Sequence, residues 1–106
     1  MLNNVILIGK ITDTPILMET RTGKKFTTVT IAVERTFKNI HGIVETDFVS
    51  CKLWSEIAKN AVDFCEIGDL ISVKGRLQTR GFDTKENIKV YTTEVIVENI
   101  KFLNHL

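Results

Sequence analysis

The stretch from Thr46 to Trp54 holds two kinds of side chain that can bind a ligand, aromatic rings and a cation. Its sequence, TDFVSCKLW, alternates as a strand with one buried face does. One face then carries Val49, Cys51 and Leu53, and the other carries Phe48, Ser50, Lys52 and Trp54. The first is an ordinary core face. Flat rings stack on unpaired bases and a lysine neutralises a phosphate, so the second face has the chemistry of a single-strand groove.

A second alternating stretch supplies further positive charge. In LISVKGRLQTR one face carries Ile71, Val73 and Leu77, and the other carries Ser72, Lys74, Arg76, Gln78 and Arg80. Phe82 follows Arg80 after one residue. From Lys74 to Lys89 there are five basic residues against two acidic ones, although the whole chain has a formal net charge of only +1. Residues 55–66, by contrast, carry one basic residue against three acidic ones, so the near-zero total separates into unlike patches.

Each of the two faces also has a purely structural explanation, and the residues alone do not decide between that explanation and ligand binding. An outward aromatic such as Trp54 is often covered by a loop, a helix or a subunit, and a basic strand face is often only solvated. Simple alternation from Val33 puts Phe37 on the core side unless a bulge or the strand end turns it outward. The remaining phenylalanines are predicted to belong to the core: Phe26, Phe64 and Phe102.

Catalysis finds little support. His41 lies in a predicted loop and His105 at the C-terminus, with no nucleophile or metal ligand at motif spacing. A glycine-rich phosphate loop is absent from the sequence. The aspartates fall in turns or at strand edges, where carboxylates cap and solvate: Asp13, Asp47, Asp69 and Asp83. We therefore predict a binding protein that is not an enzyme and uses neither a metal nor a cofactor.

The elements that must position these residues are mostly strands. Apolar or alternating stretches predict strands at Asn4–Ile11, Ile16–Thr20 (short), Phe26–Phe37, Glu45–Trp54, Leu70–Arg80 and Lys89–Leu103. Helical spacing predicts one helix, Ser55–Phe64, capped by Ser55 and stopped by Gly68. A polar loop is predicted at Gly81–Ile88, and Gly9 marks a bulge or a close backbone approach. Five long strands with a helix between the third and fourth predict an all-β OB-fold, a five-stranded Greek-key barrel, in one domain spanning residues 1–106.

The composition is typical of an ordinary soluble globular protein. Apolar residues make up 43% and charged residues 25% of the chain, and the single proline argues against a disordered linker. Cys51 falls on a core face and Cys65 in the helical region, so free structural thiols and a reducing cytoplasm are expected. The apolar run in MLNNVILIGK is too short to span a membrane and lacks a basic leader, which predicts a soluble, unexported chain with no membrane partner.

The ordered set of motifs resembles the bacterial single-stranded DNA-binding protein family nearly from end to end. It begins with NNVILIGKIT and continues through TRTG, TVTIAVERTFKN, ETDFVSCKLW and AKNAVDF to IGDLISVKGRLQTRGF and VYTTEVIVENIKFL. The combination of GRLQTR, an aromatic one residue later and then VYTTEV is specific. The resemblance implies a homotetramer of OB-folds that coats single-stranded DNA with little sequence preference. The expected setting is replication, repair, recombination or DNA uptake, at the nucleoid in the cytoplasm.

The resemblance also implies roles for individual residues. Stacking aromatics fall on Phe37, Phe48, Trp54 and Phe82, and phosphate contacts fall on Lys10, Arg35, Lys52, Lys74, Arg76 and Arg80. It turns Phe37 outward, against simple alternation. The first strand, Asn4–Ile11, is similar to the element that pairs across the dimer in this family, which gives its apolar character a use.

Several positions depart from the family pattern. The chain ends at FLNHL, so recruitment of other enzymes through an acidic tail is not expected. Met18 stands where an arginine is frequent, Ser55 and Glu56 stand where basic residues are frequent, and three of the four stacking rings are phenylalanine. We therefore expect somewhat weaker or more salt-sensitive binding.

One alternative function stays open. A dimer similar to the replication-restart relatives would use the same face for a protein partner first and DNA second. RNA also stays open as a ligand, because stacking and phosphate contacts do not read the 2′-hydroxyl.

Overall fold

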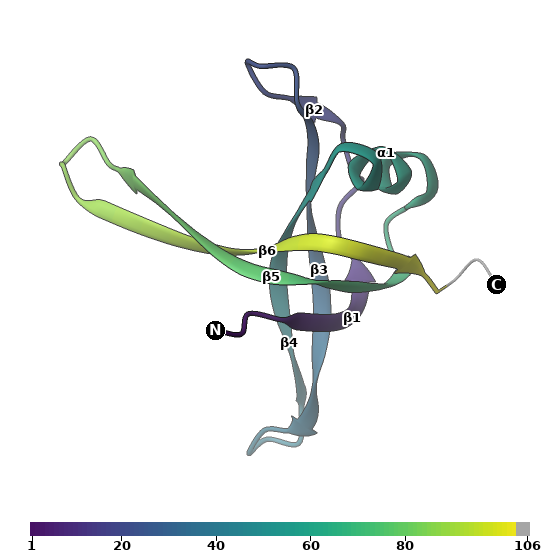
Figure 1. Cartoon of the computed structure of the whole chain (residues 1–106). Helices are drawn as coiled ribbons and strands as arrows, with labels where there is room; N and C mark the ends of the chain where they lie inside the picture. Colours follow the sequence, from purple (N-terminus) through teal and green to yellow (C-terminus); the bar gives the residue numbers. More distant parts are fainter. Residues whose placement is uncertain (104–106) are drawn as a thin grey trace.

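The structure, a computed structural model, describes residues 1–103, so His105 lies outside the described residues (Figure 1). The elements in chain order are β1 (Val5–Ile11), β2 (Met18–Glu19), β3 (Lys25–Lys38), β4 (Val44–Trp54), α1 (Ser55–Phe64), β5 (Leu70–Asp83) and β6 (Lys89–Phe102). The strand order β1-β5-β6-β4-β3-β2, with a further pairing of β1 to β3, closes the five long strands into a barrel. The predicted OB-fold is confirmed. The helix follows the third long strand, which is β4 once the short β2 is counted.

Strand β1 closes the barrel because it pairs on both sides. It runs antiparallel to β5 from Val5 to Lys10, and its last two residues pair with β3. A Cβ atom built on Gly9 would stand 2.5 Å from the carbonyl oxygen of Ala32, so only glycine allows the two backbones to approach this closely. The close approach predicted at Gly9 is confirmed.

The core comes from the apolar faces that alternation indicated. Its fully buried side chains include Ile11, Val29, Ile31, Cys51, Leu53, Ile71, Val73 and Val95. Ala58 and Ala61 of α1 join the same cluster. Both cysteines are free thiols, as predicted, and burial raises the pKa of Cys51 to about 12 and that of Cys65 to about 11.

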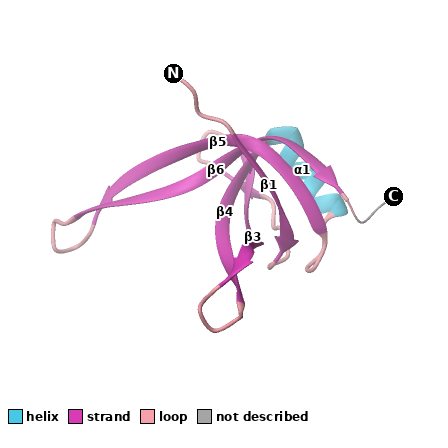
Figure 2. Cartoon of the chain, turned by 90° about the horizontal axis from the view of Figure 1, so that it is seen from below, coloured by secondary structure: helices cyan, strands magenta, loops and turns pink. Residues whose placement is uncertain are grey.

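Two hairpins extend beyond the barrel as arms (Figures 1 and 2). β5 and β6 stay paired as far as Asp83 and Lys89, so their loop covers only residues 84–88 and the longer predicted loop is wrong. Leu77 was predicted for the core and is 48% exposed, because β1 accompanies β5 only as far as Gly75. β3 and β4 form the second arm, whose outermost pair is Lys38 with Val44.

Helix α1 begins without the predicted cap. Trp54 occupies the N-cap position with an extended backbone, and no side chain caps the helix. Ser55 is already the first helical residue, with a φ of 53°, because β4 runs into α1 without a connecting loop. Phe64, predicted for the core, is 58% exposed at the last helical position, and its ring lies 6.2 Å from that of Phe102. Phe102 itself is partly buried against the core. Within residues 1–103, no helix has the length and apolar character to cross a membrane.

Candidate nucleic-acid interface

A groove opens on the outward face where β3, β4, β5 and β6 meet. Parallel pairing of β4 with β6, at Cys51 with Val95 and at Lys52 with Ile96, sets the outward side chains of β4 beside those of β6. The groove is a hollow of about 380 Å³ lined by Phe26, Thr28, Ser50, Lys52, Arg80, Thr92, Thr93 and Glu94. It therefore combines an aromatic ring, two cations, several hydroxyls and one carboxylate.

One wall of the groove belongs to a cluster of two rings and two ammonium groups, of which Phe26 and Lys52 line the hollow and Trp54 and Lys24 adjoin it. Phe26 stands directly opposite Trp54, with ring centroids 5.3 Å apart and planes tilted by 46°. The Nζ atom of Lys52 lies 4.7 Å from the Phe26 centroid and 4.6 Å from that of Trp54, and Lys24 Nζ lies 4.3 Å from the Trp54 ring. Because ring faces attract cations, the wall offers a stacking surface and positive charge at the same place.

The prediction that Phe26 belongs to the core is wrong. Along β3, buried Val29 and Ile31 alternate with outward Thr28 and Thr30, and Phe26 has the outward parity. The alternation in the sequence already contained this signal. Trp54, whose burial the sequence left open, is half-buried beside Phe26 and the two lysines.

Phe48 and Lys10 lie in one row across the outer face of the sheet. Both pair with Ala32 of β3, Phe48 from the β4 side and Lys10 from the β1 side. Neighbouring strands are about 4.8 Å apart, so the two residues are separated by about 10 Å. Phe48 is 69% exposed, and Lys10 lines a separate hollow that also contains Glu34. This row extends the aromatic and basic surface away from the groove.

Phe37 points outward, and a bulge provides the reason. The pairing of β3 with β4 shifts register between Glu34 and Lys38, so three residues of β3 stand opposite one residue of β4. Alternation from Val33 fails across such a shift. The ring of Phe37 is 63% exposed on the β3–β4 arm.

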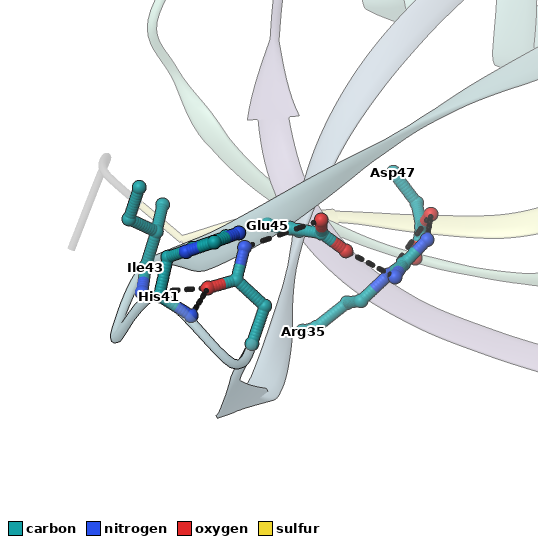
Figure 3. A network of polar contacts seen from close by, with 6 residues as sticks. Arg35, His41, Ile43, Glu45 and Asp47 are labelled. Atoms are coloured by element: carbon teal, nitrogen blue, oxygen red, sulfur yellow. Dashed lines mark hydrogen bonds and ion pairs between the residues drawn. The ribbon is translucent and has the colours of Figure 1, made fainter.

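The same arm holds Arg35 in a network of polar contacts (Figure 3). Its Nη2 donates to Asp47 Oδ1 at 2.9 Å and its Nε to Asp47 Oδ2 at 3.1 Å, while Nη1 donates to Glu45. Asn39 joins the network by donating from Nδ2 to Glu45 Oε1 at 3.4 Å, and its side-chain oxygen accepts the backbone N–H groups of His41 and Ile43. The network braces the arm across the bulge that turns Phe37 outward.

Charge in this network is dominated by the carboxylates. The hydrogen bond and the charge of Arg35 lower the pKa of Asp47, and Asp47 and Glu45 together raise the pKa of Arg35. One guanidinium faces two carboxylates, so the predicted phosphate contact at Arg35 lies in a locally acidic place.

The β5–β6 arm carries the remaining predicted residues on the groove side. Arg80 stands opposite Thr92 and lines the groove, and Phe82, 47% exposed, stands opposite Val90 farther along the arm. Arg76 is half-buried, and its Nη2 donates to Gln78 Oε1 at 3.3 Å.

Lys74 lies apart from the groove. It pairs with Ile6 of β1 and Asn99 of β6, and it lines a different hollow of about 430 Å³ with Ile6, Ser72, Glu98, Asn99 and Lys101. A register shift between Lys74 and Gly75 leaves Glu98 of β6 without a partner in the ladder, but β5 itself is continuous there. Lys74 and Arg80 therefore share a face of β5, as alternation predicts, and lie about 20 Å apart along it because they are six residues apart in the strand.

The sequence did not single out as site residues three charged or aromatic residues of the groove and the adjoining ring cluster: Lys24, Phe26 and Glu94. Lys24 lies in the turn before β3, and only the tertiary structure sets it over Trp54. Glu94 lies in the Val/Ile/Thr-rich β6, where nothing local marks which side chains reach the groove. Among residues 1–103, no group of three or more His, Cys, Asp or Glu side chains could hold a metal ion.

The barrel and groove define an OB-fold protein with the means to hold an extended nucleic-acid strand. The family model of the single-strand binding protein family matches residues 2–103, so the chain belongs to this family. The predicted resemblance is confirmed, and so is the prediction of a binding protein that is not an enzyme.

Individual relatives carry matching names. The chain is 41% identical to "Single-stranded DNA-binding protein B" of Bacillus subtilis (strain 168), over 98% of this chain and 92% of the relative. It is 43% identical to "Single-stranded DNA-binding protein" of Lactiplantibacillus plantarum, over 97% of this chain and 52% of the relative. "Single-stranded DNA-binding protein 2" of Listeria innocua is 41% identical, over 97% of this chain and 65% of the relative. The chain thus spans nearly all of the first relative and about half to two thirds of the other two.

Proposed function

We propose that residues 1–106 act as one binding domain that coats single-stranded DNA with little sequence preference. The observation that carries this proposal is the groove wall, where Lys52 lies within 4.7 Å of two ring centroids and Arg80 lines the same hollow. Stacking on a ring is available to every base, and a cation meets every phosphate, so such a surface binds without reading sequence. The names of the relatives support the same ligand.

The strand would follow the aromatic residues from one arm to the other. We assign base stacking to Phe37, Phe48, Trp54 and Phe82, and add Phe26 because it forms the groove wall with Trp54. Phosphate contacts are assigned to Lys10, Lys52, Arg76 and Arg80. The same role for Arg35 and Lys74 stays a prediction, because Arg35 is engaged by two carboxylates and Lys74 lies beside Ile6.

Self-association belongs to the same proposal. Strand β1 pairs with β3 only at its last two residues, and β3 also approaches Gly9 closely, so the open part of this edge runs from Val5 to Ile8. Ile6 and Ile8 also point outward and are 65% and 54% exposed. An open strand edge beside an apolar face can pair with the same surface of a second copy to form a dimer. A further contact through this surface would then join two dimers. We propose a homotetramer, with a dimer as the alternative.

The biological setting follows from the ligand. Single-stranded DNA arises in replication, repair, recombination and uptake, so we place the protein at the nucleoid in the cytoplasm.

Trp54 provides the direct test, because it is the one tryptophan of the chain. Its emission is measured during titration with oligothymidine, with duplex DNA of the same length, and again at raised salt. We expect quenching by the single strand, little change with the duplex, and weaker quenching at raised salt. Absence of quenching by any DNA, in a folded protein, would contradict the proposal and favour a protein partner for this face.

A further inference from the structure

The groove contains a carboxylate that has no partner within the described part of the protein. Glu94 of β6 lines the groove and is only 8% exposed. Across residues 1–103, its side chain makes no hydrogen bond or ion pair. Its oxygens are not among the buried atoms that lack a partner, so they reach the open hollow and can accept hydrogen bonds from a ligand there.

Two neighbouring polar residues are directed elsewhere. Lys52 lines the same groove, but its ammonium group lies over the rings of Phe26 and Trp54. Gln78 stands directly opposite Glu94, and its side-chain oxygen accepts a hydrogen bond from Arg76. The carboxylate therefore faces the groove with its capacity to accept hydrogen bonds unused.

A carboxylate in this place does not suit a phosphate, because two anions repel each other. It accepts hydrogen bonds and donates none. In single-stranded DNA the phosphodiester and the internal deoxyribose offer no N–H or O–H donor, so the only donors are on the edges of the bases. Within a bound strand, a base edge is therefore the only part that can donate a hydrogen bond to Glu94.

Guanine matches a carboxylate best among the four bases. Its N1–H and N2–H groups are adjacent donors that point the same way, so they can meet the two oxygens of one carboxylate. Cytosine and adenine place an acceptor nitrogen next to their amino group, and thymine flanks its one N–H with two carbonyl oxygens. A bidentate contact of this kind discriminates between bases.

We propose that Glu94 reads one base position in the groove and favours guanine there, by accepting hydrogen bonds from N1–H and N2–H. This inference rests on the proposed function, since it requires single-stranded DNA in the groove. It adds a local preference to binding that is otherwise insensitive to sequence.

The test compares the binding of three oligonucleotides of equal length to the full protein chain. The first is oligothymidine, the second has every third thymine replaced by guanine, and the third has hypoxanthine at the same positions. Affinity is measured by anisotropy of a labelled strand. The informative quantity is the guanine-to-thymine affinity ratio in the parent divided by the same ratio in Glu94→Gln. We expect this quotient to be about 10, since a good bidentate contact contributes about 1–3 kcal/mol and 1.4 kcal/mol is tenfold. Hypoxanthine, which lacks the N2 amino group, should fall between guanine and thymine in the parent.

Two further variants keep the test decisive. Glu66→Gln removes the same charge at an exposed residue that does not line the groove, and it should keep the parent ratio. Glu94→Asp retains the charge but withdraws the carboxylate by one methylene, so it should lower the ratio without strengthening the binding of oligothymidine. If Glu94→Gln does not fold, the aspartate variant decides alone.

The possible failures can be told apart. Equal ratios in the parent and the Glu94 variants, with oligothymidine still bound, would overturn the role of Glu94 and leave the proposed function standing. A parent that binds none of the oligonucleotides would overturn both.

Discussion

Replacing Lys52 by glutamine tests whether one side chain serves both the fold and the groove. The change removes two cation–π contacts, at 4.7 and 4.6 Å from the ring centroids, and keeps a polar side chain. Such contacts contribute about 0.5–1 kcal/mol each at exposed sites, so we expect the free energy of unfolding to fall by roughly 1 kcal/mol, since the two rings share one cation. That loss corresponds to a decrease in Tm of about 4–8 °C for a chain of this length.

The same change removes a positive charge from the groove. For single strands, the logarithm of the binding constant falls with the logarithm of salt concentration by about 0.7 for each phosphate neutralised, so the slope should become shallower by about that amount. Thermal melts at one fixed protein concentration and anisotropy titrations over a series of salt concentrations measure both effects.

Lys59→Gln is the matched control for Lys52→Gln. Lys59 lies on α1, where its ammonium group pairs with Glu56 at 3.3 Å, and it does not line the groove. Because exposed ion pairs of this kind contribute little, the control should melt and bind like the parent. A parent-like salt slope for Lys52→Gln would refute the phosphate contact. A parent-like Tm would refute the stabilising role of the cation.

Three further experiments address the β3–β4 arm, the β1 surface and the thiols. Arg35 lowers the pKa of Asp47 below its usual value of 3.8. The Arg35–Asp47 contact therefore stabilises the folded arm fully above that pH, and this stabilisation is lost as the pH falls through the lower folded-state pKa. Amide protection of His41 and Ile43 should therefore decrease below about pH 4 in the parent, measured by hydrogen exchange, but not in Asp47→Asn. Ile6→Lys should reduce the mass measured by sedimentation, whereas Ile67→Lys, at an apolar residue of similar exposure (63% against 65%), should not; equal masses for the two would count against the β1 surface. Cys51 and Cys65 should resist a thiol reagent in the native state and react in urea, because burial raises their pKa values to about 12 and 11, and rapid native labelling would contradict this.

Local patterns were sufficient for the strands and most of their faces. Side chains alternate along a strand with period two, so Val29, Cys51 and Ile71 could be assigned to the core from their neighbours alone. The same rule places Phe26 outward, and the wrong prediction there came from giving residue type more importance than parity.

The rule fails where the strand pairing changes. Phe37 is exposed because of a register shift in β3, and Leu77 is exposed because β1 stops pairing with β5. Neither of these features leaves a mark in the neighbouring residues, because each depends on the length and register of a partner strand.

The sequence by itself determined the set of strands, the position of the helix, the OB-fold and most of the groove's chemistry, since alternation and composition are local properties. The tertiary structure decided which of these side chains share one surface. It set Lys52 over Phe26 and Trp54, engaged Arg35 with Asp47, and placed Glu94 in the groove without a partner. These arrangements join strands far apart in the chain, and their geometry is fixed by the pairing register and the closure of the barrel.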